Sequence, residues 1–143
     1  MKRAEAVRQE FVQNWLRKAA ADLAAAQHLL TGGEHLVSSA AFHAQQTAEK
    51  ALKAVLIWHQ REAPRTHDLA LLVDLISSED PELAHKVRGA VSLTPYGVEA
   101  RYPGELPEPS AGEVREAVNL AAEILRAVVS RLPREVWPPV EER

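Results

Sequence analysis

Residues 42–54 read FHAQQTAEKALKA, a stretch in which alanines recur at helical spacing. On a helix with 3.6 residues per turn, the small and aliphatic side chains of this region fall on one face. They are Ala41, Ala44, Ala48, Ala51, Leu52, Val55 and Leu56. The pattern predicts a helix over about 36–60 that packs closely through its alanines.

The preceding segment predicts a second long helix over about 6–30. Its apolar residues share one half of a helical wheel. They are Phe11, Val12, Trp15, Leu16, Ala19, Ala20, Leu23, Ala26 and Leu30. Thr31-Gly32-Gly33 ends this helix, because glycine readily takes the left-handed conformation at a helix C-terminus. The short connection predicts that the two helices form an antiparallel hairpin.

Three shorter helices are expected after Pro64, which ends the second helix. The first covers about 68–77, with Thr66 as its cap and Asp68 in its first turn. The second covers about 81–93, from Pro81 to a stop at Pro95. The third covers about 111–132, after a capping-box pair of Ser110 and Glu113.

These elements predict an all-α fold, a five-helix up-and-down bundle over residues 11–132. The stretch from Thr94 to Ser110 has four prolines and no hydrophobic period, so we expect a long loop there. The charged, proline-rich tail 133–143 is expected to have little structure of its own.

Composition excludes several classes of function. The chain has 143 residues, a formal net charge of −3 and no cysteine, so disulfides, thiolate metal sites and thiol catalysis are excluded. Mild acidity argues against a protein that coats duplex nucleic acid. No apolar run approaches the ~20 residues of a membrane span, and we expect a cytoplasmic protein without an anchor. The scattered histidines 28, 35, 59 and 85 lack metal-ligand spacing, so no metal or cofactor is expected.

One polar stripe on the second helix is a candidate binding surface. His43, Gln46, Lys50 and Lys53 span about 80° of the wheel. Together they could hold a nucleotide phosphate or an RNA backbone. The alternative is an ordinary solvated surface, in which Glu49 and Lys53 form an i,i+4 pair. In both cases, replacing the lysines is expected to change stability little.

Asp22 lies at the edge of the apolar half of the first helix, where an unpaired carboxylate is costly. A lysine or histidine from the second helix is expected to pair with it. The pair could be purely structural, or it could orient a partner within a site.

Two loops carry further candidates. Arg61, Arg65 and His67 could hold a phosphodiester and move a proton, although Thr66 and Asp68 could equally make this a plain helix start. In the later loop, aromatic and cationic side chains could stack on and pair with a nucleotide, or the tyrosines could simply fasten the loop to the bundle. These side chains are Tyr96, Arg101 and Tyr102. We expect both loops at one end of the bundle, with Arg65, His67 and Arg101 around one anion site.

Three ordered segments resemble the HEPN domain of bacterial and archaeal small proteins. They are residues 42–54, residues 65–69 (RTHDL), and residues 93–96 (LTPY) with 99–103 (EARYP); Asp22-Leu23 is similar to the family pattern as well. The resemblance covers about residues 11–132. It implies a helical bundle that pairs with itself, a nucleotide- or RNA-binding role, and a minimal nucleotidyltransferase as partner protein in a toxin–antitoxin arrangement.

The resemblance also leaves two alternatives open. Ribonuclease members of the wider superfamily carry an arginine followed, after four to six residues, by a histidine, and Arg61 and His67 meet that spacing. This chain would then be a metal-independent ribonuclease toxin, but Pro64 departs from the pattern by placing the pair in a loop. The second alternative is a non-catalytic dimerisation module. A homodimer is also expected from the residues themselves, because Ile57 and Trp58 are predicted to be exposed and a second copy would bury them.

Overall fold

A computed structural model describes residues 2–97 and 108–138 of the chain. Five α-helices and three 3-10 helices form there, with no strand among these residues. The α-helices are α1 (Lys2–Leu29), α2 (Val37–Trp58), α3 (Leu69–Ser77), α4 (Pro81–Val87) and α5 (Ala111–Arg131). The 3-10 helices are η1 (Glu34–Leu36), η2 (Arg88–Tyr96) and η3 (Arg134–Val136). The predicted all-α class is confirmed. None of the described helices has the length and apolar character needed to cross a membrane.

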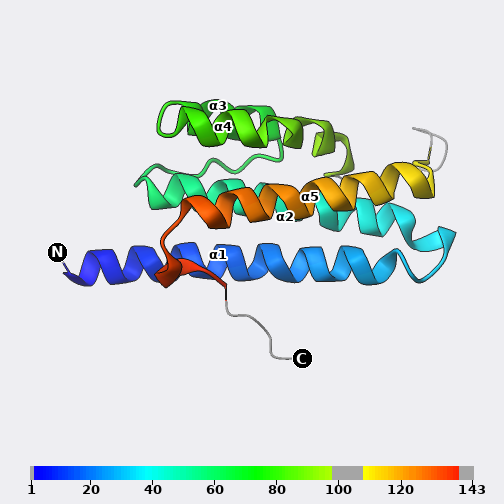
Figure 1. Cartoon of the computed structure of the whole chain (residues 1–143), viewed down its shortest axis with the longest axis horizontal. Helices are drawn as coiled ribbons and strands as arrows, with labels where there is room; N and C mark the ends of the chain where they lie inside the picture. The colour runs from blue at the N-terminus through cyan, green and yellow to red at the C-terminus, as the bar shows by residue number, and fades with distance from the viewer. Residues whose placement is uncertain (1, 98–107, 139–143) are drawn as a thin grey trace.

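Helix α2 is the centre of the molecule. It packs antiparallel to α1 on one side, while α5 lies alongside it and the layer of α3 and α4 covers the other side (Figure 1). The alanines of α2 are all at most 1% exposed. Small side chains let neighbouring helices approach closely, so these alanines allow α1 and α5 to pack tightly against α2. The positive φ of Gly33, 105°, turns the chain between the two helices.

The connection between α2 and α3 folds back along α2. After Trp58 the chain closes a Schellman motif, with Gln60 in the left-handed region (φ 61°) and a hydrogen bond from Arg61 N to Leu56 O. His67 then reaches Glu49, nine residues or about 14 Å before the end of α2. Helix α3 therefore starts beside the middle of α2 and runs in the same direction (Figure 1).

The predicted cap of the third helix and the predicted end of the fourth helix were wrong. Asp68, not Thr66, is the N-cap of α3, since its carboxylate accepts from Ala70 N while the Thr66 hydroxyl accepts from Asp68 N. The helix expected over 81–93 changes from α to 3-10 geometry after Val87 and continues past Pro95 to Tyr96. The first part of the expected loop is therefore helical, whereas residues 98–107 lie outside the described residues.

The described part of the C-terminal tail packs against the bundle, unlike the unstructured tail expected from its composition. Val136 in η3 is fully buried. The Trp137 indole donates to Leu132 O at 2.8 Å, and Gln13 of α1 donates to Trp137 O at 3.3 Å. The tail thus fastens the end of α5 to α1.

Exposure differs from expectation at three large apolar side chains. Phe11, placed in the apolar half of α1, is 56% exposed. Ile57 and Trp58, expected to be exposed, are half-buried against the core. The guanidinium of Arg8 lies 4.7 Å from the centroid of the Trp58 ring. This end of α2 is therefore covered within one chain and gives no argument for a dimer.

Asp80 couples α4 to α5 and generates a prediction for acid stability. Its carboxylate caps α4 through Leu83 N and accepts two hydrogen bonds of 2.8 Å from Arg131. The bonds from Arg131 hold the pKa of Asp80 below its ordinary value of 3.8. A lowered pKa in the folded state adds stability that is present above the ordinary value and is lost as the pH falls through the folded value.

We expect Asp80→Asn to keep the cap but to lower the free energy of unfolding at neutral pH and to flatten its decline below about pH 4. Asp80→Ala should cost about 1 kcal/mol more, because the cap is also lost. Urea denaturation across pH measures both effects. Asp74→Asn, on the exposed side of α3, is the control. If the free energy of unfolding of Asp80→Asn falls below about pH 4 as steeply as that of the wild type, Asp80 is not the source of the acid sensitivity.

Candidate functional site

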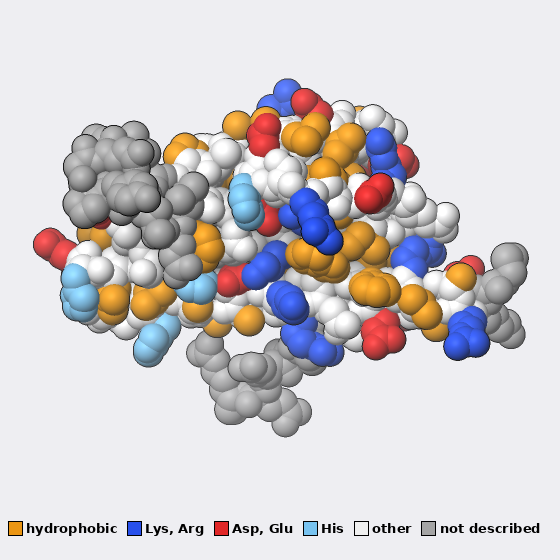
Figure 2. All heavy atoms as spheres, turned by 180° about the vertical axis from the view of Figure 1, so that it is seen from behind, with side chains coloured by type: hydrophobic (Ala, Val, Ile, Leu, Met, Phe, Trp, Pro, Cys, Tyr) orange, Lys and Arg blue, Asp and Glu red, His pale blue; other side chains and the backbone are white. Residues whose placement is uncertain are grey.

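Eight polar side chains form two neighbouring hydrogen-bonded clusters that make one polar surface across α2, from α1 to the segment before α3. We call this surface the polar band. Its members are Asp22, His43, Gln45, Gln46, Glu49, Lys50, Lys53 and His67. Figure 2 shows basic, acidic and histidine side chains gathered in the middle of one face of the molecule, next to hydrophobic ones.

Asp22 organises the α1 side of the polar band. One carboxylate oxygen, Oδ1, is hydrogen-bonded to His43 Nδ1 at 2.8 Å, and Oδ2 accepts from Lys50 Nζ at 2.5 Å. The Asp22 side chain is only 12% exposed. Both residue types expected from the sequence, a histidine and a lysine of the second helix, thus meet this carboxylate.

Glu49 organises the other side of the polar band. Its Oε1 is hydrogen-bonded to His67 Nδ1 at 2.7 Å and accepts from Gln45 Nε2 at 3.1 Å. Its Oε2 accepts from Lys53 Nζ at 3.2 Å. With a side-chain exposure of 6%, Glu49 is a buried carboxylate that is stable only because three side chains donate to it.

Gln45 forms the floor beneath Glu49. It is fully buried, accepts from Gln46 Nε2 at 2.7 Å and donates to His67 O at 3.4 Å. The backbone of Gly97 lies against it, so that a Cβ at that position would sit 3.2 Å from Gln45 Cδ. The chain before α3 and the end of η2 therefore meet over Gln45.

The arrangement leaves hydrogen-bonding capacity on the outside of the polar band. The His67 side chain is 67% exposed, and only its Nδ1 is engaged by Glu49. Its Nε2 is therefore left for a hydrogen-bond partner at the surface. A lysine ammonium has three donors, and Lys50 spends one on Asp22, so two remain at its partly exposed end.

The polar band is not the freely solvated stripe that was one alternative from the sequence. The Lys53 side chain is 10% exposed, and its ammonium lies 5.9 Å from the centroid of the Trp15 ring. The prediction that replacing Lys53 changes stability little assumed an exposed ion pair. That assumption is wrong, because the Glu49–Lys53 pair is buried. Because the pair is buried, removing either partner would leave the charge of the other uncompensated.

The structure does not bring Arg61 and His67 together. Arg61 donates to Leu75 O at 3.4 Å and lies 3.6 Å from Glu79 Oε1, beside the C-terminal half of α3. His67 lies just before the start of α3, a helix of nine residues and about 14 Å. The two residues thus reach opposite ends of α3 within one chain.

Of the other predicted loop residues, the structure describes Arg65 and Tyr96. Arg65 is exposed near His67. The loops do meet, since Leu69 N donates to Thr94 Oγ1 at 3.3 Å, but they meet beside the middle of α2 and not at an end of the bundle. Tyr96 is half-buried and lines a hollow between η2 and α5. Arg101 and Tyr102 lie outside the described residues.

Sequence reasoning missed Gln45 as a site residue and treated Glu49 as a simple helix pair. A signal was present for both, because on the wheel they fall on the same arc as Leu52 and Leu56. The argument used for Asp22, that a polar group on an apolar face needs a partner, applies to them equally.

The comparisons with known proteins agree with this architecture. The family model described as HEPN domain matches residues 12–132. The crystal structure of TT1696 from Thermus thermophilus is similar with 30% sequence identity and a TM-score of 0.67, over 85% of this chain and 98% of that one. The structure of ST0689, described as an archaeal HEPN homologue, is similar with 27% identity and a TM-score of 0.63, over 84% and 96% of the two chains. No protein of curated function matches the chain.

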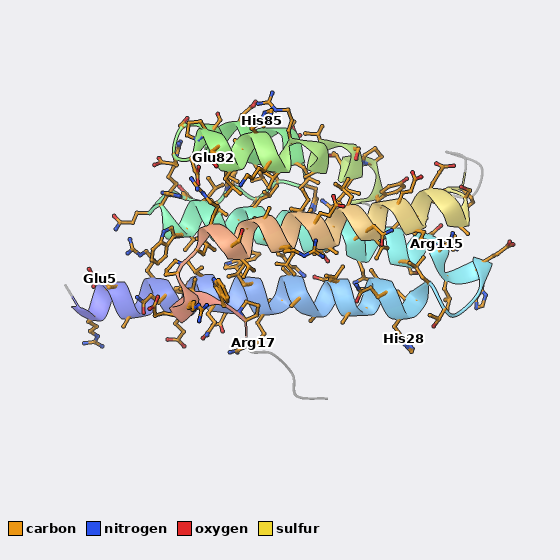
Figure 3. The ribbon with its side chains drawn as sticks, in the orientation of Figure 1. Glu5, Arg17, His28, Glu82, His85 and Arg115 are labelled. Atoms are coloured by element: carbon orange, nitrogen blue, oxygen red, sulfur yellow. The ribbon has the colours of Figure 1, made fainter. Side chains whose placement is uncertain are left out.

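Two glutamate–lysine pairs with the same i,i+4 spacing give a matched test of burial. Lys53→Ala leaves Glu49 buried with one donor fewer, and we expect it to lower the free energy of unfolding by about 1–3 kcal/mol. Lys86→Ala breaks the exposed pair with Glu82 on the outer helix α4 (Figure 3) and should cost less than about 0.5 kcal/mol. Urea denaturation of both variants measures the difference. Equal losses would show that the Glu49–Lys53 pair behaves as a solvated one.

Proposed function

The chain belongs to the HEPN domain family, and on this basis we propose that it is a nucleotide- or RNA-binding protein that holds phosphate at the polar band. We propose further that it is the partner subunit of a nucleotidyltransferase in a toxin–antitoxin pair. The phosphate-binding role is supported by the arrangement of the site. The partnership is supported by the family resemblance.

The observation that carries the binding proposal is the pairing of the band's cations with buried carboxylates. Asp22 and Glu49 fix Lys50 and Lys53 in place, so little side-chain entropy remains to be lost when an anion binds. The free donors of the more exposed Lys50 ammonium can then meet phosphate oxygens with charge-assisted hydrogen bonds. The carboxylates also limit the net positive charge, which favours a site for one or two phosphates over a broad basic surface.

The other two functions derived from the sequence receive less support. A ribonuclease that uses Arg61 and His67 of one chain needs both side chains on the same phosphodiester, whereas here they lie near opposite ends of α3. A module that only dimerises has no need of two buried carboxylates that each orient a lysine and a histidine.

Lys50 gives the direct test of phosphate binding. We expect Lys50→Ala to weaken binding of a labelled single-stranded oligonucleotide and to reduce the salt slope, because about one counterion-releasing contact is lost. Fluorescence anisotropy over a range of salt concentrations measures both. Lys86→Ala, which removes a lysine from α4, should bind as the wild type does. Identical affinity and slope in Lys50→Ala at low salt would refute the proposal, provided that circular dichroism shows the variant to be folded.

We propose that the protein is a homodimer, as the family resemblance implies. Leu71 of α3 and Val91 of η2 are 40% and 39% exposed, and a second copy placed on this layer would bury both. Light scattering at micromolar concentration should then give twice the chain mass of 15.8 kDa. A monomer mass across a wide concentration range would contradict this expectation.

The partnership has a separate test. When the protein is co-expressed with a nucleotidyltransferase encoded by an adjacent gene, both proteins should elute together in size-exclusion chromatography. Separate elution of the two folded proteins would remove the partnership and leave the binding role untouched.

A further inference from the structure

A surface hollow of about 430 Å³ lies between the N-terminal half of α1 and α2, next to the polar band. Its lining residues are Phe11, Asn14, Trp15, Arg17, Lys18 and Lys50. This volume is within the range of about 300–1,000 Å³ that is typical of small-molecule sites. Lys50 belongs to both surfaces, so the hollow and the polar band are continuous.

Two aromatic rings shape this hollow. Phe11 and Trp15 are separated by four residues, which places them on the same side of α1. Phe11 is the most exposed large hydrophobic side chain among the described residues, at 56%, although its neighbour Val12 is fully buried. Trp15 is half-buried and has the Lys53 ammonium on its ring. The hollow thus offers one open aromatic face beside an anchored one.

The polar groups of the hollow have one sign of charge. Arg17, Lys18 and Lys50 line it, and no carboxylate from residues 2–97 or 108–138 does. Three other hollows each have at least one glutamate in their lining, as with Glu113 and Glu116 between η2 and α5. Asn14 adds an amide, which Arg17 holds through a hydrogen bond of 3.4 Å. Arg17 itself lies on α1, on the side away from α3 and α4 (Figure 3).

We propose that this hollow is a stacking site for an unpaired base of a single-stranded nucleic acid. The base lies against Phe11 and Trp15, Asn14 is within the lining to hydrogen-bond its edge, and the neighbouring phosphates meet Lys18 and Lys50. The strand then continues over Lys50 to the polar band. The inference rests on the proposed function and adds the class of ligand, since aromatic platforms beside cations are how proteins bind strands with accessible bases.

Exposed cations outside the polar band favour a strand over a free nucleotide. Lys18 lies on α1 and Arg65 lies before α3, so a strand can contact cations beyond the one or two phosphates held at the polar band. A second copy of the chain fits the hollow poorly. In a two-fold symmetric contact the same cationic surface would face itself, and like charges would oppose the association.

The test compares Phe11→Ala with Val7→Ala, which removes a similarly exposed apolar side chain from α1 outside the hollow. Binding of both variants is measured by fluorescence anisotropy with a labelled 12-nucleotide single strand, and with its duplex as a second probe. We expect Phe11→Ala to weaken single-strand binding about fivefold or more, with an unchanged salt slope, because a stacking contact and no charge is lost. Val7→Ala should bind as the wild type does, and the wild type should prefer the single strand to the duplex.

Several results would overturn the inference. If Phe11→Ala binds the strand like the wild type while Lys50→Ala binds more weakly, stacking fails and the phosphate-binding role stands. If the wild type binds ATP but no strand, the ligand class is wrong. If light scattering shows that Phe11→Ala alone halves the mass of a dimer, the hollow is an interface between copies. If the wild type binds neither strand nor ATP, the proposed function itself fails.

Discussion

The buried carboxylate of Glu49 constrains both the path of the chain and the layout of the site. A carboxylate with 6% side-chain exposure requires several donors, and α2 by itself supplies only Gln45 and Lys53. The third donor, His67, comes from the connection to α3. The fold-back after Trp58 delivers it there, so the start of α3, the contact with η2 and the surface histidine all follow from one charged group.

The pairing of buried carboxylates with lysines and histidines also suits the polar band to bind a ligand. Buried ion pairs are seldom a large net source of stability, because desolvation offsets much of the attraction. What they provide here is position, since each carboxylate holds a lysine and a histidine in one orientation. A partly neutralised and rigid cluster is a poor general polyanion surface but a good local receptor for phosphate, in agreement with the chain's overall net charge of −3.

Much of the fold could be predicted from the sequence because its signals are local. Alanine spacing predicted α1 and α2, Gly33 marked the turn between them, and Ser110 with Glu113 marked the start of α5. Within the site, the need of Asp22 for a partner was also readable, because a carboxylate on an apolar face is anomalous on any wheel. The predictions failed where geometry changed gradually, as at the transition from α4 to η2, and where a residue lay at the margin of a face, as with Phe11.

The sequence by itself therefore determined the all-α class, the long hairpin and the presence of cations on α2, since each depends on spacing within a few turns of helix. Only the tertiary structure decided which of those cations are buried, that His67 rather than Arg61 joins them, and that Phe11 remains open beside Lys50. These outcomes depend on the path of the connection between α2 and α3 and on the position of α1 relative to α2. A periodic pattern specifies which side of a helix is apolar, but it does not specify which distant segment will cover that side, because burial is a property of two surfaces in contact.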